Sequence, residues 1–156
     1  MVDPADITNT TLAIAADYEN RPDALIEILH RVQARVGHVP ELVVQTLANA
    51  LNLSRAEVHG VVTFYHDFKR EPHGRHVLKM CRAEACQSMG GNALVKSVEA
   101  RLGIACGETT ADGNVTLEPV YCLGLCATSP SAMLDDKLHG RLTKARMDAL
   151  LTAVGA

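Results

Sequence analysis

Four of the five cysteines form two close pairs whose thiol groups could together bind a metal ion or an iron-sulfur cluster. Cys81 and Cys86 are separated by four residues, and Cys122 and Cys126 by three. Each pair comes directly after an apolar, strand-like run, so each is expected in a loop. Two such loops on neighbouring strands can converge, and together they supply the four thiolates of one complete site.

Four kinds of site use paired cysteines, and the spacing separates them. A thioredoxin-type redox site needs a C-x-x-C motif, which this sequence lacks. Structural zinc takes four thiolates around one ion but usually includes a tighter pair. A 2Fe-2S cluster distributes its four thiolates over two irons and tolerates wider loops, although the plant-type spacing differs from this one. Disulfides would need an oxidising compartment, and no secretory signal is visible.

The remaining cysteine and the histidines offer no comparable pattern. Cys106 lies between Ala105 and Gly107 and is expected to be a small, half-buried apolar residue. A Rieske centre would replace two cysteines with two histidines, which four paired cysteines make unnecessary. The histidines are scattered along the chain: His30, His38, His59, His66, His73, His76 and His139.

Composition excludes several classes of function. The chain has 156 residues, a formal net charge of -3 and only five aromatic residues, so it lacks the basic stripe and the stacking platforms of a nucleic-acid binder. No apolar run is long enough to cross a bilayer, and no targeting pattern is visible, so we expect no membrane insertion and a cytoplasmic location. Without a G-x-G-x-x-G or Walker motif, the chain is not expected to bind NAD, FMN or ATP by those motifs.

The polar stretch 69–75 resembles a linker and predicts two domains, residues 1–70 and residues 75–156. The first domain is predicted to be a small helical bundle. Pro22 and Pro40 begin two of its helices, and Ser54 with Glu57 forms a capping box that begins a third. Their predicted apolar faces are Leu25, Ile28, Leu29, Val32 and Val36; Leu42, Val43, Leu47 and Leu51; and Val58, Val61, Val62 and Tyr65.

In the second domain the pattern changes to strands mixed with helices. Strands are predicted over 76–80 and 115–121, each leading into a cysteine pair, with a helix between them that ends at Gly103. A hairpin is predicted from 132–134 and 138–142, and Thr143 is expected to cap a final helix. The expected order is therefore strand, helix, three strands, helix, an α/β fold.

Three segments resemble a known family. The sequences CRAEACQSMGG (81–91) and YCLGLCATSP (121–130) are similar to the cluster loops of thioredoxin-like 2Fe-2S proteins, the small iron-sulfur subunits of NADH-oxidising complexes. SRAEVHGVVTFYHDF (54–68) is similar to the helix that precedes the cluster domain in that family. The resemblance leaves only about the first twenty residues unmatched. It implies a thioredoxin-like domain after a helical bundle, and one 2Fe-2S cluster on Cys81, Cys86, Cys122 and Cys126.

Within the family, the sequence is most similar to the gamma subunit of cytoplasmic NAD-dependent formate dehydrogenase. Complex I members commonly have proline just before the second cysteine, whereas this chain has Ala85. The resemblance implies an electron carrier that exchanges electrons with the FMN of an NADH-binding beta subunit, while an alpha subunit with molybdenum or tungsten oxidises formate. The alternatives are the equivalent subunit of complex I or of an NAD-reducing hydrogenase and, in another class, a zinc-binding adaptor.

Several groups near the cysteines are candidates to tune the reduction potential of such a cluster. The hydroxyls of Ser88, Thr128 and Ser129 and the backbone N–H groups of the second loop could donate hydrogen bonds to sulfur. Arg82 could favour the more negative, reduced state. Each of these side chains also has an ordinary structural explanation, as a cap, a turn residue or a solvated charge.

Overall fold

The computed structural model describes residues 3–156 and divides the chain into two compact units. The first unit ends at Pro72, and the second runs from His73 to Ala156. This division lies within the stretch 69–75 that was predicted to be a linker. Each unit has a hydrophobic core of its own and is described by itself.

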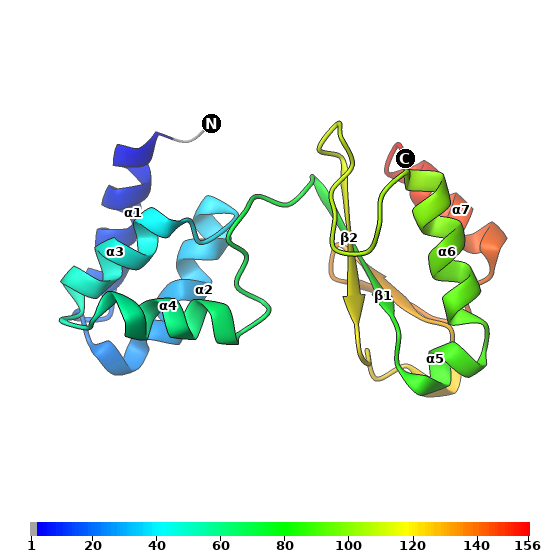
Figure 1. Ribbon diagram of the computed structural model, residues 1–156, viewed down its shortest axis with the longest axis horizontal. Helices are drawn as coiled ribbons and strands as arrows, with labels where there is room; N and C mark the ends of the chain where they lie inside the picture. The colour runs from blue at the N-terminus through cyan, green and yellow to red at the C-terminus, as the bar shows by residue number, and fades with distance from the viewer. Residues whose placement is uncertain (1–2) are drawn as a thin grey trace. The chain divides into compact units, whose positions relative to one another are not determined.

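The first unit consists of helices packed around one core (Figure 1). The helices are α1 (Pro4–Asp17), the short 3-10 helix η1 (Pro22–Ala24), α2 (Leu25–Val36), α3 (Glu41–Ala50) and α4 (Arg55–Phe64). Fully buried side chains such as Ile28, Leu29 and Leu47 fill its centre. Because apolar residues recur at helical spacing on α2, α3 and α4, this core could be predicted from the sequence.

Helix α1 was not predicted, although its beginning follows ordinary rules. The carboxylate of Asp3 accepts a hydrogen bond from the N–H of Ala5, and Pro4 occupies the first turn. The buried face of α1 includes Thr11, whose hydroxyl donates to the carbonyl of Ile7 at 2.7 Å. A polar residue at a core position interrupts the apolar pattern, so the helix is not recognisable by periodicity alone.

The predicted helix ends agree with the structure, but two predicted core positions do not. Ser54 and Glu57 form the capping box of α4, and Gly37 ends α2 with a φ of 89°. Leu42 and Tyr65 are exposed, at 39% and 42%. Leu42 lies in the first turn of α3, where Val43 and Val44 take the inward direction instead. Tyr65 follows the last residue of α4 and has an extended backbone, so helical spacing no longer applies to it.

The second unit is an α/β domain built on a four-stranded sheet. Its elements are β1 (His76–Cys81), α5 (Glu84–Ser88), α6 (Gly91–Leu102), β2 (Val115–Val120), η2 (Cys126–Thr128), β3 (Ala132–Leu134), β4 (Lys137–His139) and α7 (Lys144–Ala153). The strand order is β2-β1-β3-β4, with β1 parallel to β2 and antiparallel to β3. Pro119 in β2 cannot donate to a ladder, and β2 is an edge strand where this does no harm.

The hairpin between β3 and β4 is tighter than predicted. Asp135 and Asp136 have φ angles of 47° and 66°, as the two central residues of a type I′ turn require. Leu134 therefore pairs directly with Lys137. The last strand begins at Lys137 and ends at His139, and Leu142, predicted to lie in the strand, is a buried residue of the loop that follows.

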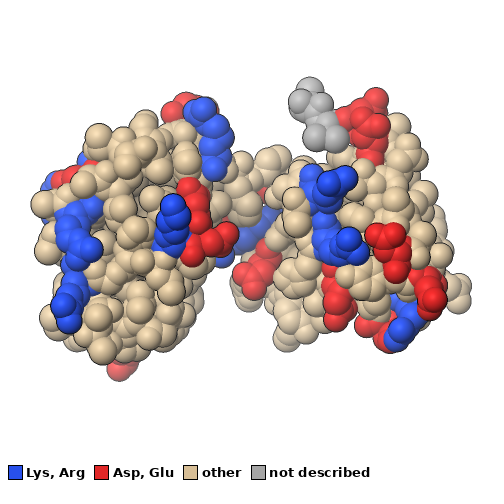
Figure 2. Space-filling model, turned by 180° about the vertical axis from the view of Figure 1, so that it is seen from behind, with Lys and Arg blue, Asp and Glu red and all other residues tan. Residues whose placement is uncertain are grey.

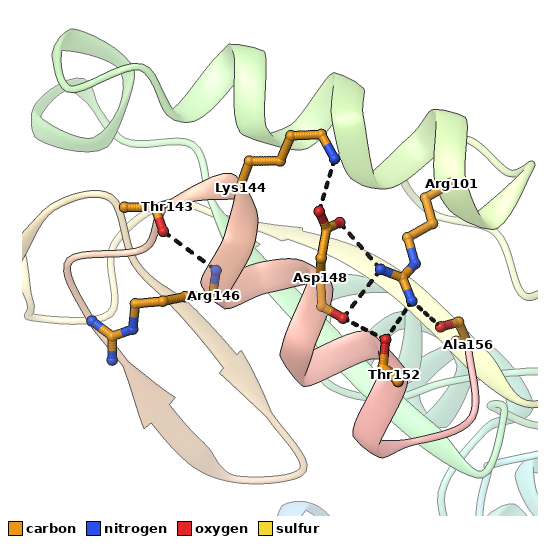
Figure 3. Close-up of polar contacts among 7 residues, drawn as sticks. All are labelled: Arg101, Thr143, Lys144, Arg146, Asp148, Thr152 and Ala156. Carbon is orange, nitrogen blue, oxygen red and sulfur yellow. Dashed lines mark hydrogen bonds and ion pairs between the residues drawn. The ribbon is translucent and has the colours of Figure 1, made fainter.

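Helices α6 and α7 cover the same face of the sheet (Figure 1), and one arginine joins them (Figure 3). The guanidinium of Arg101 on α6 donates to the carbonyl and carboxylate of Asp148, at 3.1 and 3.2 Å. It also donates to the hydroxyl of Thr152 at 2.8 Å and to the carbonyl of Ala156. One planar group therefore donates to a carbonyl within α7 and to one just beyond its end, in addition to forming an ion pair.

We expect Arg101→Met to lower the free energy of unfolding of the second unit by about 1–2 kcal/mol, because charge-assisted hydrogen bonds to carbonyls are lost. Chemical denaturation followed by circular dichroism measures this change. Lys144→Met is the matched control. Lys144 has one ion pair with the same Asp148, at 2.8 Å, and its side chain is 70% exposed, so its removal should cost under about 0.5 kcal/mol. Equal costs for the two variants would contradict this account.

The charged side chains are mixed rather than segregated. Figure 2 shows blue and red side chains interspersed on the visible face of each unit. This mixture agrees with the small formal net charge of -3. Within residues 3–156, no helix combines the length and apolar character that crossing a bilayer requires.

Candidate metal centre

The first cysteine pair is buried where the central strand of the sheet ends. Cys81 is the last residue of β1 and is 4% exposed, because β1 is flanked by β2 and β3. Its N–H donates to the carbonyl of Ser131 at 3.1 Å. Cys86 is 1% exposed and lies in α5, a short helix that was not predicted. The turn after α5 brings Gly91 against the backbone of Cys86.

The second pair lies in an exposed loop directly after β2. Cys122 has a φ of 141°, a strained conformation for a residue other than glycine, and Gly124 follows with a φ of 75°. The tight turn aims the N–H of Gly124 at the sulfur of Cys122, at 3.3 Å. The sulfur atoms of Cys122 and Cys126 are 3.7 Å apart, and both residues are exposed.

Hydrogen bonds join the two loops around the sulfur atoms. The N–H of Arg82, next to Cys81, donates to the carbonyl of Val120 at 2.7 Å, just before the second loop begins. The sulfur of Cys86 lies 3.5 Å from the hydroxyls of both Ser129 and Ser131, which follow the second pair in the chain. The structure therefore places the segments that carry the two cysteine pairs next to each other.

The surroundings shift the pKa values of three of these thiols in different directions. Burial raises the pKa of Cys81, and the neighbouring Cys86 raises it further. Burial also acts to raise the pKa of Cys86, but its hydrogen bonds with Ser131 and Ser129 outweigh burial and hold the pKa below its usual value. The pKa of exposed Cys126 is raised by its hydrogen bond with Cys122 and by the charge of that residue.

The predicted tuning groups have mixed outcomes. The backbone of the second loop does donate to sulfur, through the N–H of Gly124. Ser88 and Thr128 instead donate to carbonyls three residues back in the chain. The hydroxyl of Ser129 donates to the carbonyl of Cys126 at 2.8 Å while also lying near a sulfur.

Two further residues have environments that bear on the site, Ser131 beside it and Cys106 away from it. Ser131 was missed by sequence reasoning, because it lies five residues after the last cysteine and only the fold brings it to Cys86. Cys106 is half-buried and packs against the second core, as predicted. Burial and the nearby Glu99 raise the pKa of its thiol.

The two sulfur atoms of the second pair have the spacing of ligands that share one metal ion. Two thiolates on a tetrahedral metal, with bonds of about 2.3 Å, lie about 3.8 Å apart. The distance between Cys122 and Cys126 is 3.7 Å, which matches this value. Among residues 3–156, no three histidine, cysteine or acidic side chains gather closely enough to hold a single ion. The spacing of the second pair thus fits two thiolates on one metal, and a 2Fe-2S cluster would take its other two thiolates from the first loop.

The comparison with protein families decides the classification. The model of the thioredoxin-like 2Fe-2S ferredoxins matches residues 11–155. The chain belongs to this family. As a member, this ferredoxin carries one 2Fe-2S cluster, and its family membership confirms both the resemblance and the fold class expected from the sequence. The match also reaches about ten residues further toward the N-terminus than the resemblance did.

Individual relatives are subunits of NADH-oxidising complexes. The ferredoxin is 41% identical over 144 residues to an NADH-quinone oxidoreductase subunit of Rhizobium meliloti, covering 92% of this chain and 86% of that protein. It is 39% identical over 136 residues to the corresponding subunit of the Pseudomonas aeruginosa oxidoreductase, covering 87% and 82%. Neither relative is a formate dehydrogenase subunit, so that narrower resemblance still depends on the sequence features alone.

A solved structure gives the same architecture. The ferredoxin superposes on a chain of an NAD+-reducing NiFe-hydrogenase in its air-oxidised state with a TM-score of 0.73 and 26% sequence identity. The match covers 85% of the ferredoxin but only 23% of the hydrogenase chain. This ferredoxin therefore corresponds to about a quarter of that chain, and the activity of the whole hydrogenase does not transfer with the fold.

Proposed function

We propose that this ferredoxin is the electron-carrying subunit of an NADH-oxidising complex and that its four loop cysteines hold the cluster. The observation that carries the proposal is the convergence of the two loops, in which the hydroxyl of Ser129, after the second pair, lies 3.5 Å from the sulfur of Cys86 in the first. The proposed ligands are Cys81, Cys86, Cys122 and Cys126. When bound, a 2Fe-2S cluster accepts and donates single electrons.

The two pairs would serve different purposes in such a carrier. Cys81 and Cys86 are almost completely buried, so their environment excludes water and favours a defined reduction potential. Cys122 and Cys126 are exposed, which would leave one side of the site accessible to a partner. Tyr121, next to this pair, is 74% exposed and gives the loop an apolar contact surface.

The proposed partner is an FMN- and NADH-binding flavoprotein subunit. A flavin accepts both electrons of a hydride, so a one-electron carrier beside it would convert paired electron transfer into single steps. The names of the relatives support this partner, because their complexes oxidise NADH. We propose a cytoplasmic location, because the cytosol keeps thiols reduced and therefore available as cluster ligands.

This subunit could belong to one of three kinds of complex. The relatives that are about 40% identical favour an NADH-quinone oxidoreductase, with this chain in the place that those relatives occupy. Ala85 favours the second candidate, the gamma subunit of an NAD-dependent formate dehydrogenase, because complex I members commonly have proline there. In that case an alpha subunit with molybdenum or tungsten would oxidise formate. The third candidate is the equivalent subunit of an NAD-reducing hydrogenase, which the structural match to a hydrogenase chain supports.

Electron paramagnetic resonance of the dithionite-reduced protein at low temperature, with spins counted against protein, tests the carrier. We expect a near-stoichiometric S = 1/2 signal, together with two irons and two sulfides per chain. A silent sample that contains zinc would overturn the proposal in favour of a zinc-binding adaptor.

Purification of the tagged chain from its native host identifies the complex. A complex that reduces quinone with NADH supports the first candidate, and one whose cluster is reduced by formate supports the second. Reduction by hydrogen would indicate the hydrogenase. A chain that copurifies with no flavoprotein would contradict the proposed partner.

A further inference from the structure

Ser131 contacts both cysteines of the first loop from a buried position. The residue is 2% exposed and lies between Pro130 and β3. Its carbonyl accepts the N–H of Cys81 at 3.1 Å, which fixes its backbone to the end of β1. Its hydroxyl oxygen lies 3.5 Å from the sulfur of Cys86, within hydrogen-bond range for sulfur. The hydroxyl therefore has a fixed place beside one particular thiolate.

The direction of this hydrogen bond follows from the chemistry of the site. A metal-bound cysteine is a thiolate and has no proton to donate. The hydroxyl of Ser131 must then be the donor. Among residues 3–156, this hydroxyl has no other hydrogen-bond partner. Its proton is therefore available to the sulfur of Cys86.

Ser129 provides an internal contrast at the same distance. Its hydroxyl is also 3.5 Å from the sulfur of Cys86, but there the sulfur is the donor, which a thiolate cannot be. The proton of the Ser129 hydroxyl is given to the carbonyl of Cys126, at 2.8 Å. Two serines on either side of Pro130 thus lie equally near the sulfur, yet only Ser131 has its proton available.

We propose that the Ser131 hydroxyl donates a hydrogen bond to the Cys86 thiolate and thereby raises the reduction potential of the cluster. Reduction adds negative charge that is shared by the sulfur ligands, so a donor at sulfur stabilises the reduced state more than the oxidised state. Burial strengthens the effect, because the local dielectric constant is low and water does not compete. Ser131 is a positioning and tuning residue, and this role rests on the proposed cysteine ligands.

The test is an EPR-monitored redox titration of the full-length protein and its Ser131→Ala variant. We expect the variant to keep its cluster and its equilibrium constant for one-electron reduction to fall about tenfold, which is about 59 mV. Ser129→Ala is the matched control and should change the constant less than about twofold, because it removes no donor to sulfur. Ser131→Thr retains the hydroxyl and should restore the wild-type potential.

Each outcome is decisive. An unchanged potential in a fully loaded Ser131→Ala protein would overturn the inference, as would a larger shift in Ser129→Ala. If Ser131→Ala loses the cluster while Ser131→Thr keeps it with the wild-type potential, the hydroxyl is needed and the inference is supported. Loss of the cluster in both variants would overturn it, because packing would then explain the role of Ser131. A wild-type chain without a cluster would instead overturn the proposed function.

Discussion

Serine substitution at any one of the four loop cysteines is expected to lower the 2Fe-2S content of the protein more than about tenfold. Loss of an outer partner of a ligand already costs about 10–100-fold in metal affinity, and loss of a ligand should cost at least as much. The variants are Cys81→Ser, Cys86→Ser, Cys122→Ser and Cys126→Ser. Anaerobic reconstitution followed by visible absorption, iron analysis and quantitative EPR measures the cluster.

Cys106→Ser is the matched control for this series. It makes the same replacement of sulfur by oxygen. Cys106 is half-buried, packs against the second core and lies in neither cysteine loop. We expect its cluster content and EPR line shape to equal those of the wild type. If this variant lost the cluster, or if one of the four loop variants retained it with an unchanged spectrum, the proposed ligand set would be wrong.

The four variants should also differ in the stability of the protein without a cluster. Cys81 and Cys86 are buried, and a serine hydroxyl placed there needs a hydrogen-bond partner in a site built for sulfur. Cys122 and Cys126 are exposed, so serine is readily solvated there. Chemical denaturation of the apoproteins should therefore show lower stability for the first pair and almost unchanged stability for the second.

The sequence contains enough local information to predict most elements of the fold. Strands that lead into each cysteine pair, the capping box at Ser54, the helix end at Gly103 and the cap at Thr143 all depend on residues within a few positions of each other. The family match confirms the fold class that these elements indicate. Helix α1 was not predicted, because the polar residue Thr11 occupies one of its core positions and interrupts the apolar pattern. Its burial is possible because its hydroxyl donates to the carbonyl of Ile7 in the same helix.

The chemistry around the sulfur atoms was less accessible to sequence reasoning. The cysteine spacing predicts that two pairs act together, but which hydroxyls reach a sulfur depends on the packing of separate strands. Ser131 reaches Cys86 because β3 pairs with β1, a contact between residues 45 positions apart in the chain. Ser88 is close in sequence to Cys86, yet its hydroxyl is bonded to the carbonyl of Ala85. Proximity in sequence was therefore a poor guide to the donors.

A methyl group at Gly91 is expected to displace the backbone of the first cysteine loop. An added Cβ would lie 2.5 Å from the carbonyl oxygen of Cys86 and 2.9 Å from its carbonyl carbon, far inside van der Waals contact. Both atoms belong to the backbone, so no side-chain rotation relieves the overlap. We expect Gly91→Ala to lower the free energy of unfolding of the second unit by about 1–3 kcal/mol and to reduce cluster content.

Gly60→Ala is the control with the opposite expected sign. Gly60 lies within α4 of the first unit, and an added Cβ would meet no atom within 4 Å. Alanine there should raise the free energy of unfolding by about 0.5–1 kcal/mol, because it has the higher helix propensity, and it should leave the cluster unchanged. Denaturation curves and cluster absorption of both variants measure these effects. If Gly91→Ala matched the wild type in both, the close packing of α6 against Cys86 would not be what positions this sulfur.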